Sequence, residues 1–152
     1  MTTVPSETGT ALPKEGRLLA IDFGDGHTGF ALSDPLQITA QNYSSYAVKG
    51  DRQGLLAHIE QLIREKNIVG IVLGMPVNMN GSEGEMVGRV RKFAEQLRTQ
   101  VQLPIAFIDE RLTSRQAMRT LNELGTRRSK KKDAVHSMAA TLMLRAYLDG
   151  NR

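Results

Sequence analysis

The 152-residue sequence predicts an α/β fold, a mixed five-stranded sheet with helices on both faces. Short apolar runs bounded by glycine or proline have the length and composition of buried strands. Longer segments with apolar residues at helical spacing alternate with the later runs. Three strand-like runs come first without a helix between them, which indicates antiparallel pairing, and the alternation that follows indicates parallel strands joined by helices.

The five expected strands are rich in aliphatic or aromatic residues. They cover residues 18–23, 28–33, 39–48, 69–74 and 105–108. The run at 69–74 is apolar throughout, which is typical of a strand buried on both faces. The first and last strands can run parallel, so their carboxyl ends are expected at one rim of the sheet, where open sheets bind ligands.

Four helices are expected after the third strand. Asp51 can cap the first, which runs to about residue 66. Ser82 with Glu85 and Thr113 with Gln116 are capping-box signatures for the next two. The last helix is expected from about residue 133 to 148, because apolar residues recur there at helical spacing.

Composition excludes several classes of protein. The chain has no cysteine, so disulfides and thiolate metal sites are absent, which suits a cytoplasmic protein. No apolar run approaches the roughly 20 residues of a membrane span. Residues 1–16 are polar, hold two prolines and lack the apolar core of a signal peptide. The sequence therefore predicts a disordered tail at 1–16 and one domain at 17–152.

The net charge of +4 is modest, but its cations cluster. Five of the six residues at 127–132 are basic: Arg127, Arg128, Lys130, Lys131 and Lys132. We expect a loop here that binds a polyanion, the alternative being a solvated flexible loop. With only three tyrosines, four phenylalanines and no tryptophan, recognition by broad aromatic stacking is not expected.

Asp22 is the first candidate for chemistry. The apolar run that contains it leads into a turn with Gly24, Gly26 and Gly29, so its carboxylate would lie where a ligand can approach the backbone. A metal ion could be held there. The alternative is that Asp22 only accepts hydrogen bonds from turn amides. A second acid, Asp34, ends the next apolar run.

Further acids come at the ends of other expected elements. Glu110 follows the last strand, and Asp133 opens the last helix with His136 three residues later. Carboxylates at one rim repel one another unless a cation intervenes, and Mg²⁺ or Mn²⁺ suits oxygen ligands. Two such ions can activate water and stabilise the leaving oxygen of a phosphodiester. A lone histidine beside an apolar stripe is more often a packing or surface residue, but the neighbouring Asp133 favours His136 as a ligand for Mn²⁺.

Other polar residues are candidates for binding substrate. Arg111 adjoins Glu110, and Asn78 lies in a loop before a helix; the alternatives are a solvated helix face and an ordinary turn. His27, in the glycine turn, could contact a substrate phosphate. His58 is expected at the surface of the first helix.

Four motifs together resemble the YqgF (RuvX) family. They are Ile-Asp-Phe-Gly at 21–24, Gly-Phe-Ala-Leu-Ser-Asp at 29–34, Leu-Gly-Met-Pro-Val-Asn-Met-Asn-Gly at 73–81 and Asp-Glu-Arg-Leu-Thr-Ser at 109–114. The resemblance covers residues 17–149 and implies an RNase H-like fold related to the RuvC Holliday junction resolvases. It implies a nuclease that processes the 5′ end of the 16S ribosomal RNA precursor, with Holliday junction resolution assigned to some members. Asp22 then matches the first catalytic acid, and Glu110 the acid of the Asp-Glu-Arg motif.

The sequence departs from the family pattern in the last helix. The family has an aspartate three residues ahead of an Ala-Ala pair, and here His136 holds that place before Ala139 and Ala140. Asp133 lies one turn earlier, where RuvC relatives often carry a further acid. The departure implies either a site that favours Mn²⁺ or one weakened in catalysis. At His27 many members carry arginine or a serine-like residue.

Four functions follow from these observations. The first is a metal-dependent nuclease acting on precursor ribosomal RNA, with Asp22, Glu110, Asp133 and His136 at the metals. The second is a resolvase of branched DNA, which should act as a two-fold dimer to cut two strands symmetrically. The third is a nucleic-acid-binding factor without turnover. The fourth is an actin-like ATPase or sugar kinase, which needs two such domains, and 152 residues allow one.

Overall fold

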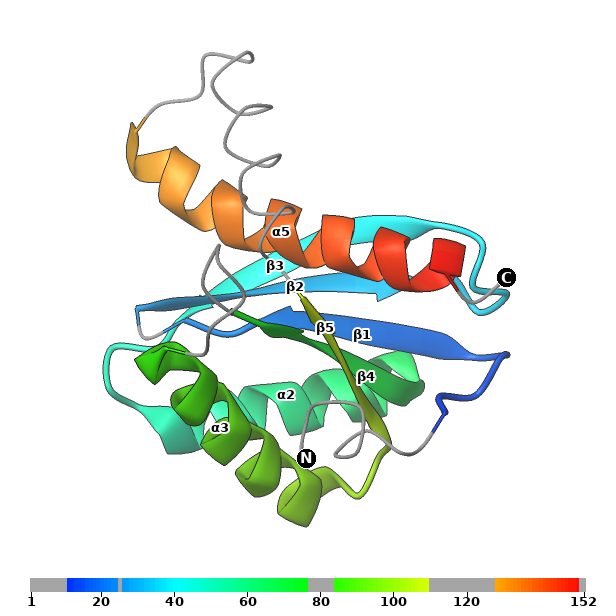
Figure 1. Ribbon diagram of the computed structural model, residues 1–152, viewed down its shortest axis with the longest axis horizontal. Helices are drawn as coiled ribbons and strands as arrows, with labels where there is room; N and C mark the ends of the chain where they lie inside the picture. Colours follow the sequence, from blue (N-terminus) through cyan, green and yellow to red (C-terminus); the bar gives the residue numbers. More distant parts are fainter. Residues whose placement is uncertain (1–10, 25, 77–83, 110–127, 151–152) are drawn as a thin grey trace.

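The computed structural model describes residues 11–24, 26–76, 84–109 and 128–150, and the side chains of the last segment from residue 137 onward. Its described elements form one five-stranded sheet in the order β3-β2-β1-β4-β5 with three helices (Figure 1). In chain order they are β1 (Arg17–Asp22), β2 (His27–Ser33), β3 (Ala40–Ala47), α2 (Arg52–Lys66), β4 (Ile68–Met75), α3 (Glu85–Val101), β5 (Ile105–Asp109) and α5 (Arg128–Gly150).

The sheet is mixed, as the sequence predicts. β1 pairs with β2, and β2 with β3, in antiparallel fashion. β4 pairs in parallel with both β1 and β5. In register, Ile21 of β1 lies beside Leu73 of β4, and Leu73 beside Phe107 of β5. The first and last strands are therefore parallel, and their carboxyl ends share one rim.

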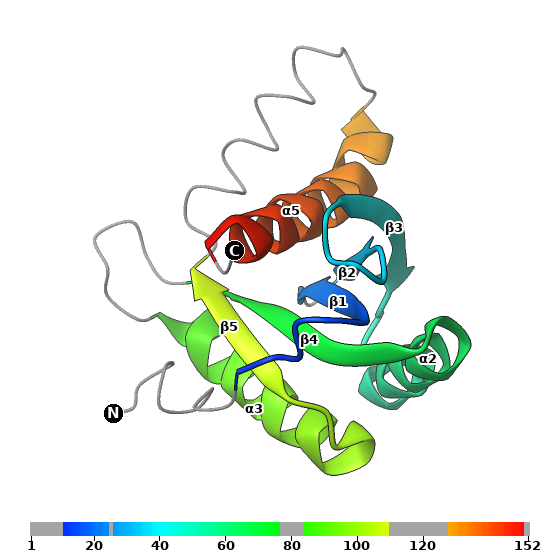
Figure 2. The same ribbon diagram turned by 90° about the vertical axis from the view of Figure 1, so that its right-hand side faces the viewer.

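Helices cover both faces of the sheet. Figure 2 shows α5 on one side of the sheet and α2 and α3 on the other. The strand alternation of β1 divides its side chains accordingly. Leu19 and Ile21 join the core beneath α2 and α3, whereas Leu18 and Ala20 join the core beneath α5.

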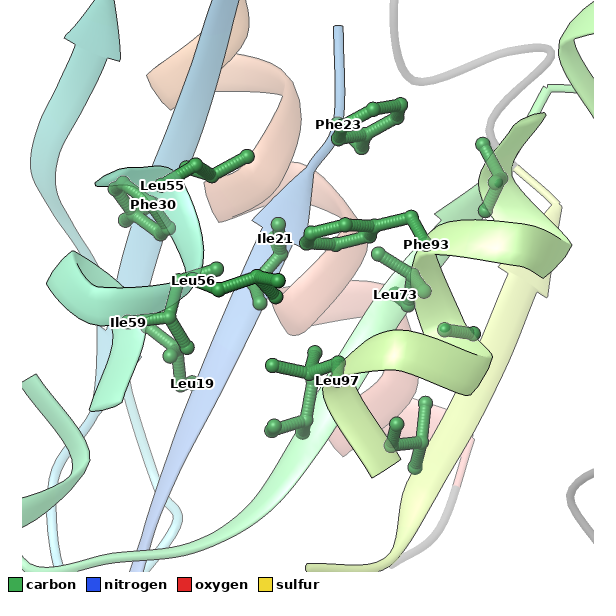
Figure 3. Packing of buried hydrophobic residues seen from close by; sticks show 14 of the residues in the cluster. Leu19, Ile21, Phe23, Phe30, Leu55, Leu56, Ile59, Leu73, Phe93 and Leu97 are labelled. Atoms are coloured by element: carbon green, nitrogen blue, oxygen red, sulfur yellow. The ribbon is translucent and has the colours of Figure 1, made fainter. Parts of the chain in front are cut away.

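The core beneath α2 and α3 is made of large side chains. Phe30 and Phe93 are fully buried there, with Leu55, Leu56 and Ile59 of α2 around them (Figure 3). Each such burial stabilises the fold by about 1.5–3 kcal/mol. The helical spacing of these residues in the sequence therefore identifies the buried faces of both helices.

The helix caps confirm one prediction and correct another. Asp51 is the N-cap residue of α2, and its Oδ1 accepts a 2.9 Å hydrogen bond from the Gly54 amide. A Cβ at Gly54 would collide with Oδ2 of Asp51, so a side chain there would require the carboxylate to turn. α3 begins at Glu85 with Gly84 as its N-cap residue and without a side-chain cap, so the predicted capping box with Ser82 is wrong. The pair Thr113 and Gln116 lies outside the described residues.

The basic cluster is helical where we expected a loop. α5 begins at Arg128, five residues before the predicted start, so Arg128 and Lys130 to Lys132 belong to its first turns. Lysine and arginine are good helix formers, and the segment holds no glycine or proline to stop a helix. Arg127 lies outside the described residues.

The packed domain begins earlier than residue 17. Leu12 is 4% exposed and joins the core beneath α5. Gln37 Nε2 donates to the carbonyl oxygens of Pro13 (2.9 Å) and Gly16 (3.0 Å). Residues 11–16, assigned by sequence to the tail, are thus part of the domain, because one leucine and a few backbone carbonyls anchor them. Within the described ranges, no helix is both long and apolar enough to cross a membrane.

Candidate functional site

Asp22 ends the central strand β1 at the carboxyl rim of the sheet. It is 5% exposed. Leu18 and Ala20, four and two residues earlier, contribute to the core beneath α5, so strand alternation places Asp22 on the α5 face. A carboxylate this buried needs hydrogen bonds, an ion pair or a metal ion.

The turn after Asp22 is held by a hydroxyl and by backbone. Thr28 is fully buried, and its Oγ1 lies 3.5 Å from the Gly24 amide and 3.4 Å from the Gly24 carbonyl. The Val48 amide donates to the Gly26 carbonyl at 2.8 Å, which ties the turn to the end of β3. His27 opens β2 beside this turn, half-buried and paired with Ala47 in the ladder. His27 therefore lies on the same rim as Asp22.

Asp109 ends β5 at the same rim but on the other face. Alternate residues of a strand share a face, so Asp109 lies on the same face as Ile105 and Phe107, which belong to the core beneath α2 and α3. Ile108 packs on the α5 face, level with Asp22 along the strands. Asp109 is also exposed, so it does not join Asp22. The predicted ligand Glu110 and its neighbour Arg111 lie outside the described residues, as does Asn78.

Helix α5 runs across the sheet in the direction opposite to β1. Near its end, Tyr147 is hydrogen-bonded to backbone of Leu12, just ahead of β1. In its middle, the Thr141 hydroxyl bonds to Asn42 Oδ1 of β3. The helix therefore begins toward the Asp22 end of the sheet, as the view in Figure 1 also shows. Asp133 and His136 lie in its first turns, and their side chains lie outside the described set.

Of the predicted metal ligands, Asp22 is the one whose side chain the structure describes. No three histidine, aspartate or glutamate side chains gather in the parts of the chain that the structure describes. Asp22 fits the chemistry of Mg²⁺ or Mn²⁺, because it is a buried oxygen donor at the rim. The remaining predicted ligands belong to the segments without described side chains.

Asp34, the second acid that the sequence singles out, has a different role. Its Oδ1 accepts hydrogen bonds from the amides of Ile38 (2.8 Å) and Thr39 (2.7 Å), and its Oδ2 from the amide of Leu36 (3.2 Å). These bonds, above all the one from Thr39, hold the pKa of Asp34 below its ordinary value. Asp34 therefore fixes the β2–β3 turn, at the end of the sheet away from Asp22.

His58 is not the surface residue that we expected. Its ring stacks on Tyr46 with 4.8 Å between centroids and lies 5.5 Å from Phe30. Burial lowers the pKa of His58 below its ordinary value. The residue packs β3 against α2, and no sequence signal separated it from a solvated position on that helix.

Sequence reasoning also missed a group beside Asp22. Phe23 stacks on Phe93 of α3, and Arg52 of α2 lies over both rings. The one available signal was the position of Phe23, next to the candidate metal ligand.

Sequence comparisons relate the chain to known proteins. A family model described as "RuvX: Holliday junction resolvase" matches residues 16–150. A relative from Ruminiclostridium cellulolyticum, named "Putative pre-16S rRNA nuclease", is 41% identical over 133 residues, which are 88% of this chain and 94% of the relative. A relative of the same name from Dictyoglomus turgidum is 40% identical over 133 residues, with the same coverage of both chains.

Solved structures show the fold. Thermus thermophilus RuvC in complex with a Holliday junction substrate is similar with a TM-score of 0.52 at 12% identity, over 87% of this chain and 95% of that one. A yeast mitochondrial Holliday junction resolvase gives 0.50 at 12% identity, over 97% and 88%. The predicted RNase H-like fold is confirmed.

Proposed function

The chain belongs to the RuvX family, and on that premise we propose that it is a cytoplasmic, metal-dependent nuclease that cleaves RNA. The substrate we propose is the 5′ end of the 16S ribosomal RNA precursor, as the names of its relatives suggest for those proteins. The observation that carries the proposal is the place of Asp22, a buried carboxylate at the carboxyl rim of the central strand and on the face covered by α5.

Asp22, Glu110, Asp133 and His136 are the proposed metal ligands and catalytic residues. The alternation of β5 supports Glu110, because Ile108 packs on the α5 face and the residue two positions later has the same parity. The helical repeat supports the other two. Counting back from the buried Ala140 in steps of four and three residues reaches His136 and then Asp133.

These residues would hold divalent ions which, when bound, would supply an activated water and charge neutralisation at the leaving oxygen. Asp22 places its oxygen donors at the rim on the α5 face, and the other three residues are proposed as further donors to the same ions. Arg127 and the cationic start of α5, with Arg128 and Lys130 to Lys132, are proposed to hold the phosphate backbone. Asn78 and Arg111 are proposed as further substrate contacts beside the scissile phosphate.

The test is cleavage of a single-stranded precursor RNA and of a four-way DNA junction in parallel assays. Each substrate is incubated with EDTA, Mg²⁺ or Mn²⁺, with wild type and with Asp22→Asn. We expect RNA cleavage that needs a divalent ion and is lost in the variant. Full activity of Asp22→Asn, or cleavage in EDTA, would contradict the proposal.

Branched DNA is the second candidate substrate. It is favoured by the description of the matching family model and by the likeness to RuvC solved with a Holliday junction. A resolvase would cut the junction at two symmetric positions and would bind it as a homodimer. Paired symmetric cuts together with a dimer in analytical ultracentrifugation would move the assignment to this activity.

The departure at His136 favours a third candidate, a nucleic-acid-binding factor without turnover. Binding of RNA at wild-type affinity with no cleavage in either ion would support it. Restoring the family pattern by His136→Asp then gives a direct comparison, because a gain of cleavage in the variant would identify the histidine as the cause.

A further inference from the structure

Phe23, the residue after Asp22, is held by an aromatic stack on the opposite face of the sheet. Its ring centroid lies 4.4 Å from that of Phe93, with 15° between the ring planes (Figure 3). Phe93 is fully buried on α3, and Phe23 is 5% exposed. Stacked rings at this separation attract each other beyond the area they bury, so the pair fixes the end of β1 against α3.

Arg52, in the first turn of α2, covers the ring pair. Its guanidinium carbon lies 5.0 Å from the centroid of Phe23 and 5.9 Å from that of Phe93, within the range of a cation–π contact. Its Nη1 donates a 2.9 Å hydrogen bond to Oε1 of Gln96 on α3. Arg52 thus links α2, α3 and the end of β1 at one point.

Without this stack, the backbone around Asp22 is held by the β1–β2 ladder and by the contacts of Thr28 and Val48 with the following turn. Asp22 is paired with Gly29 in the β1–β2 ladder. On its carboxyl side the chain enters a turn whose described residues Gly24 and Gly26 have no side chain to pack. Phe23 adds a large apolar side chain that packs this part of the chain against the core.

We propose that Phe93 and Arg52 are positioning residues that hold the Asp22 carboxylate in place through Phe23. This inference rests on the proposed function, since Asp22 is a metal ligand only there. A displacement of about 1 Å at a reacting group can lower a rate by about 100-fold, so a loosened Phe23 should be visible in turnover. Binding of RNA should change little, because the proposed phosphate contacts lie on other segments.

The experiment compares Phe93→Leu and Arg52→Met with a matched control, Leu97→Ala. Leu97 is equally buried in the same core and lies one helical turn further along α3. RNA cleavage is measured at a temperature well below the unfolding midpoint of each variant. The quantities determined are kcat, KM and the Mn²⁺ concentration that gives the half-maximal rate. We expect about 10-fold lower kcat for Phe93→Leu with KM within about 2-fold, and a higher Mn²⁺ requirement. Phe23→Tyr, which keeps a stacked ring, should retain near wild-type turnover, and so should Leu97→Ala.

The outcomes separate this inference from the function beneath it. If wild type cleaves RNA and Asp22→Asn does not, the function stands. Equal kcat and Mn²⁺ requirement in Phe93→Leu and Leu97→Ala would then overturn the positioning role alone. If Phe93→Leu does not fold, Arg52→Met decides, and wild-type values for it would overturn the inference. A wild type without cleavage, or an active Asp22→Asn, would overturn both.

Discussion

Asp22 and Asp34 end neighbouring strands of the same hairpin, yet the structure gives them opposite surroundings. Both follow an apolar run and both come beside a turn. Asp34 stabilises its own turn, because its carboxylate accepts hydrogen bonds from the amides of Leu36, Ile38 and Thr39. Asp22 is buried on the α5 face, and the Gly24 amide of its turn lies within hydrogen-bond distance of the Thr28 hydroxyl instead.

The difference shows how one sequence pattern serves two purposes. Because β1 and β2 are antiparallel, their carboxyl ends lie at opposite ends of the sheet. Asp22 shares its end with the carboxyl termini of the parallel strands β4 and β5 and with the start of α5. Asp34 shares its end with residues 12–16 and the last turn of α2. The direction of the strand thus separates a candidate catalytic acid from a structural one.

The largest expected effect is on cleavage by Asp22→Asn. Removing one negative oxygen donor from the rim should lower the rate of RNA cleavage by about 1000-fold or more, a loss typical of removing a group that acts in the transition state. Gel-shift affinity for the same RNA should stay within a few-fold, since the phosphate contacts lie elsewhere. Loss of binding in parallel with cleavage would contradict this division of roles.

The cationic start of α5 should make the Asp22 end of the sheet bind RNA more strongly than the Asp34 end. Replacing Lys130, Lys131 and Lys132 by glutamine should weaken RNA binding and lower the slope of log affinity against log salt by about 2, at about 0.7 per phosphate contact with a single strand. The matched control neutralises three cations away from α5, namely Lys14, ahead of β1, and Arg64 and Lys66, in the last turn of α2. An equal change of the salt slope in the control would contradict the proposal that the start of α5 binds the phosphate backbone.

Asp34→Ala should destabilise the protein without altering the chemistry. Without the carboxylate, three turn amides lose their protein acceptor and hydrogen-bond to water instead. Comparable side-chain caps contribute about 1 kcal/mol to the free energy of unfolding. Urea unfolding should therefore show a lower midpoint with an unchanged slope. The rate of RNA cleavage under folding conditions should equal that of wild type. A large loss of cleavage in fully folded Asp34→Ala would place this acid in the catalytic machinery.

The pH dependence of stability gives the smallest effect and separates Asp34 from His58. The pKa of Asp34 is lowered from 3.8, so its contribution is present above pH 3.8 and lost as pH falls through its folded value. The pKa of His58 is lowered from 6.5, so folding weakens already as pH falls below 6.5. His58→Phe should remove the upper step and Asp34→Asn the lower one. Urea titrations at several pH values measure the free energy of unfolding for each variant. A variant that kept both steps would contradict the assignment of its residue.

Much of the fold could be predicted because its signals are local. Strand ends such as Asp22, the N-cap Asp51 and the helical spacing of Leu55, Leu56 and Ile59 need no knowledge of distant residues. The order of antiparallel and parallel strands followed from the order of elements. All of these agree with the structure within a few residues.

What failed depends on contacts that are remote in the sequence. Leu12 is anchored by α5 and by the turn near Gln37, so residues 11–16 pack although their composition resembles a tail. His58 of α2 is half-buried against Phe30 of β2 and Tyr46 of β3. The stack of Phe23, Phe93 and Arg52 joins three elements, and only its first member lies near a motif. Glu110, Asp133 and His136 remain predictions as metal ligands.

The most direct test counts Mn²⁺ ions bound in the presence of RNA by electron paramagnetic resonance. It uses wild type, Asp22→Asn and Asp34→Asn, with an RNA whose scissile bond cannot be hydrolysed. If Asp22 holds the catalytic metal, wild type and Asp34→Asn will bind Mn²⁺ equally. Asp22→Asn will bind fewer Mn²⁺ ions or bind them with lower affinity. Equal Mn²⁺ binding by all three proteins would contradict the account.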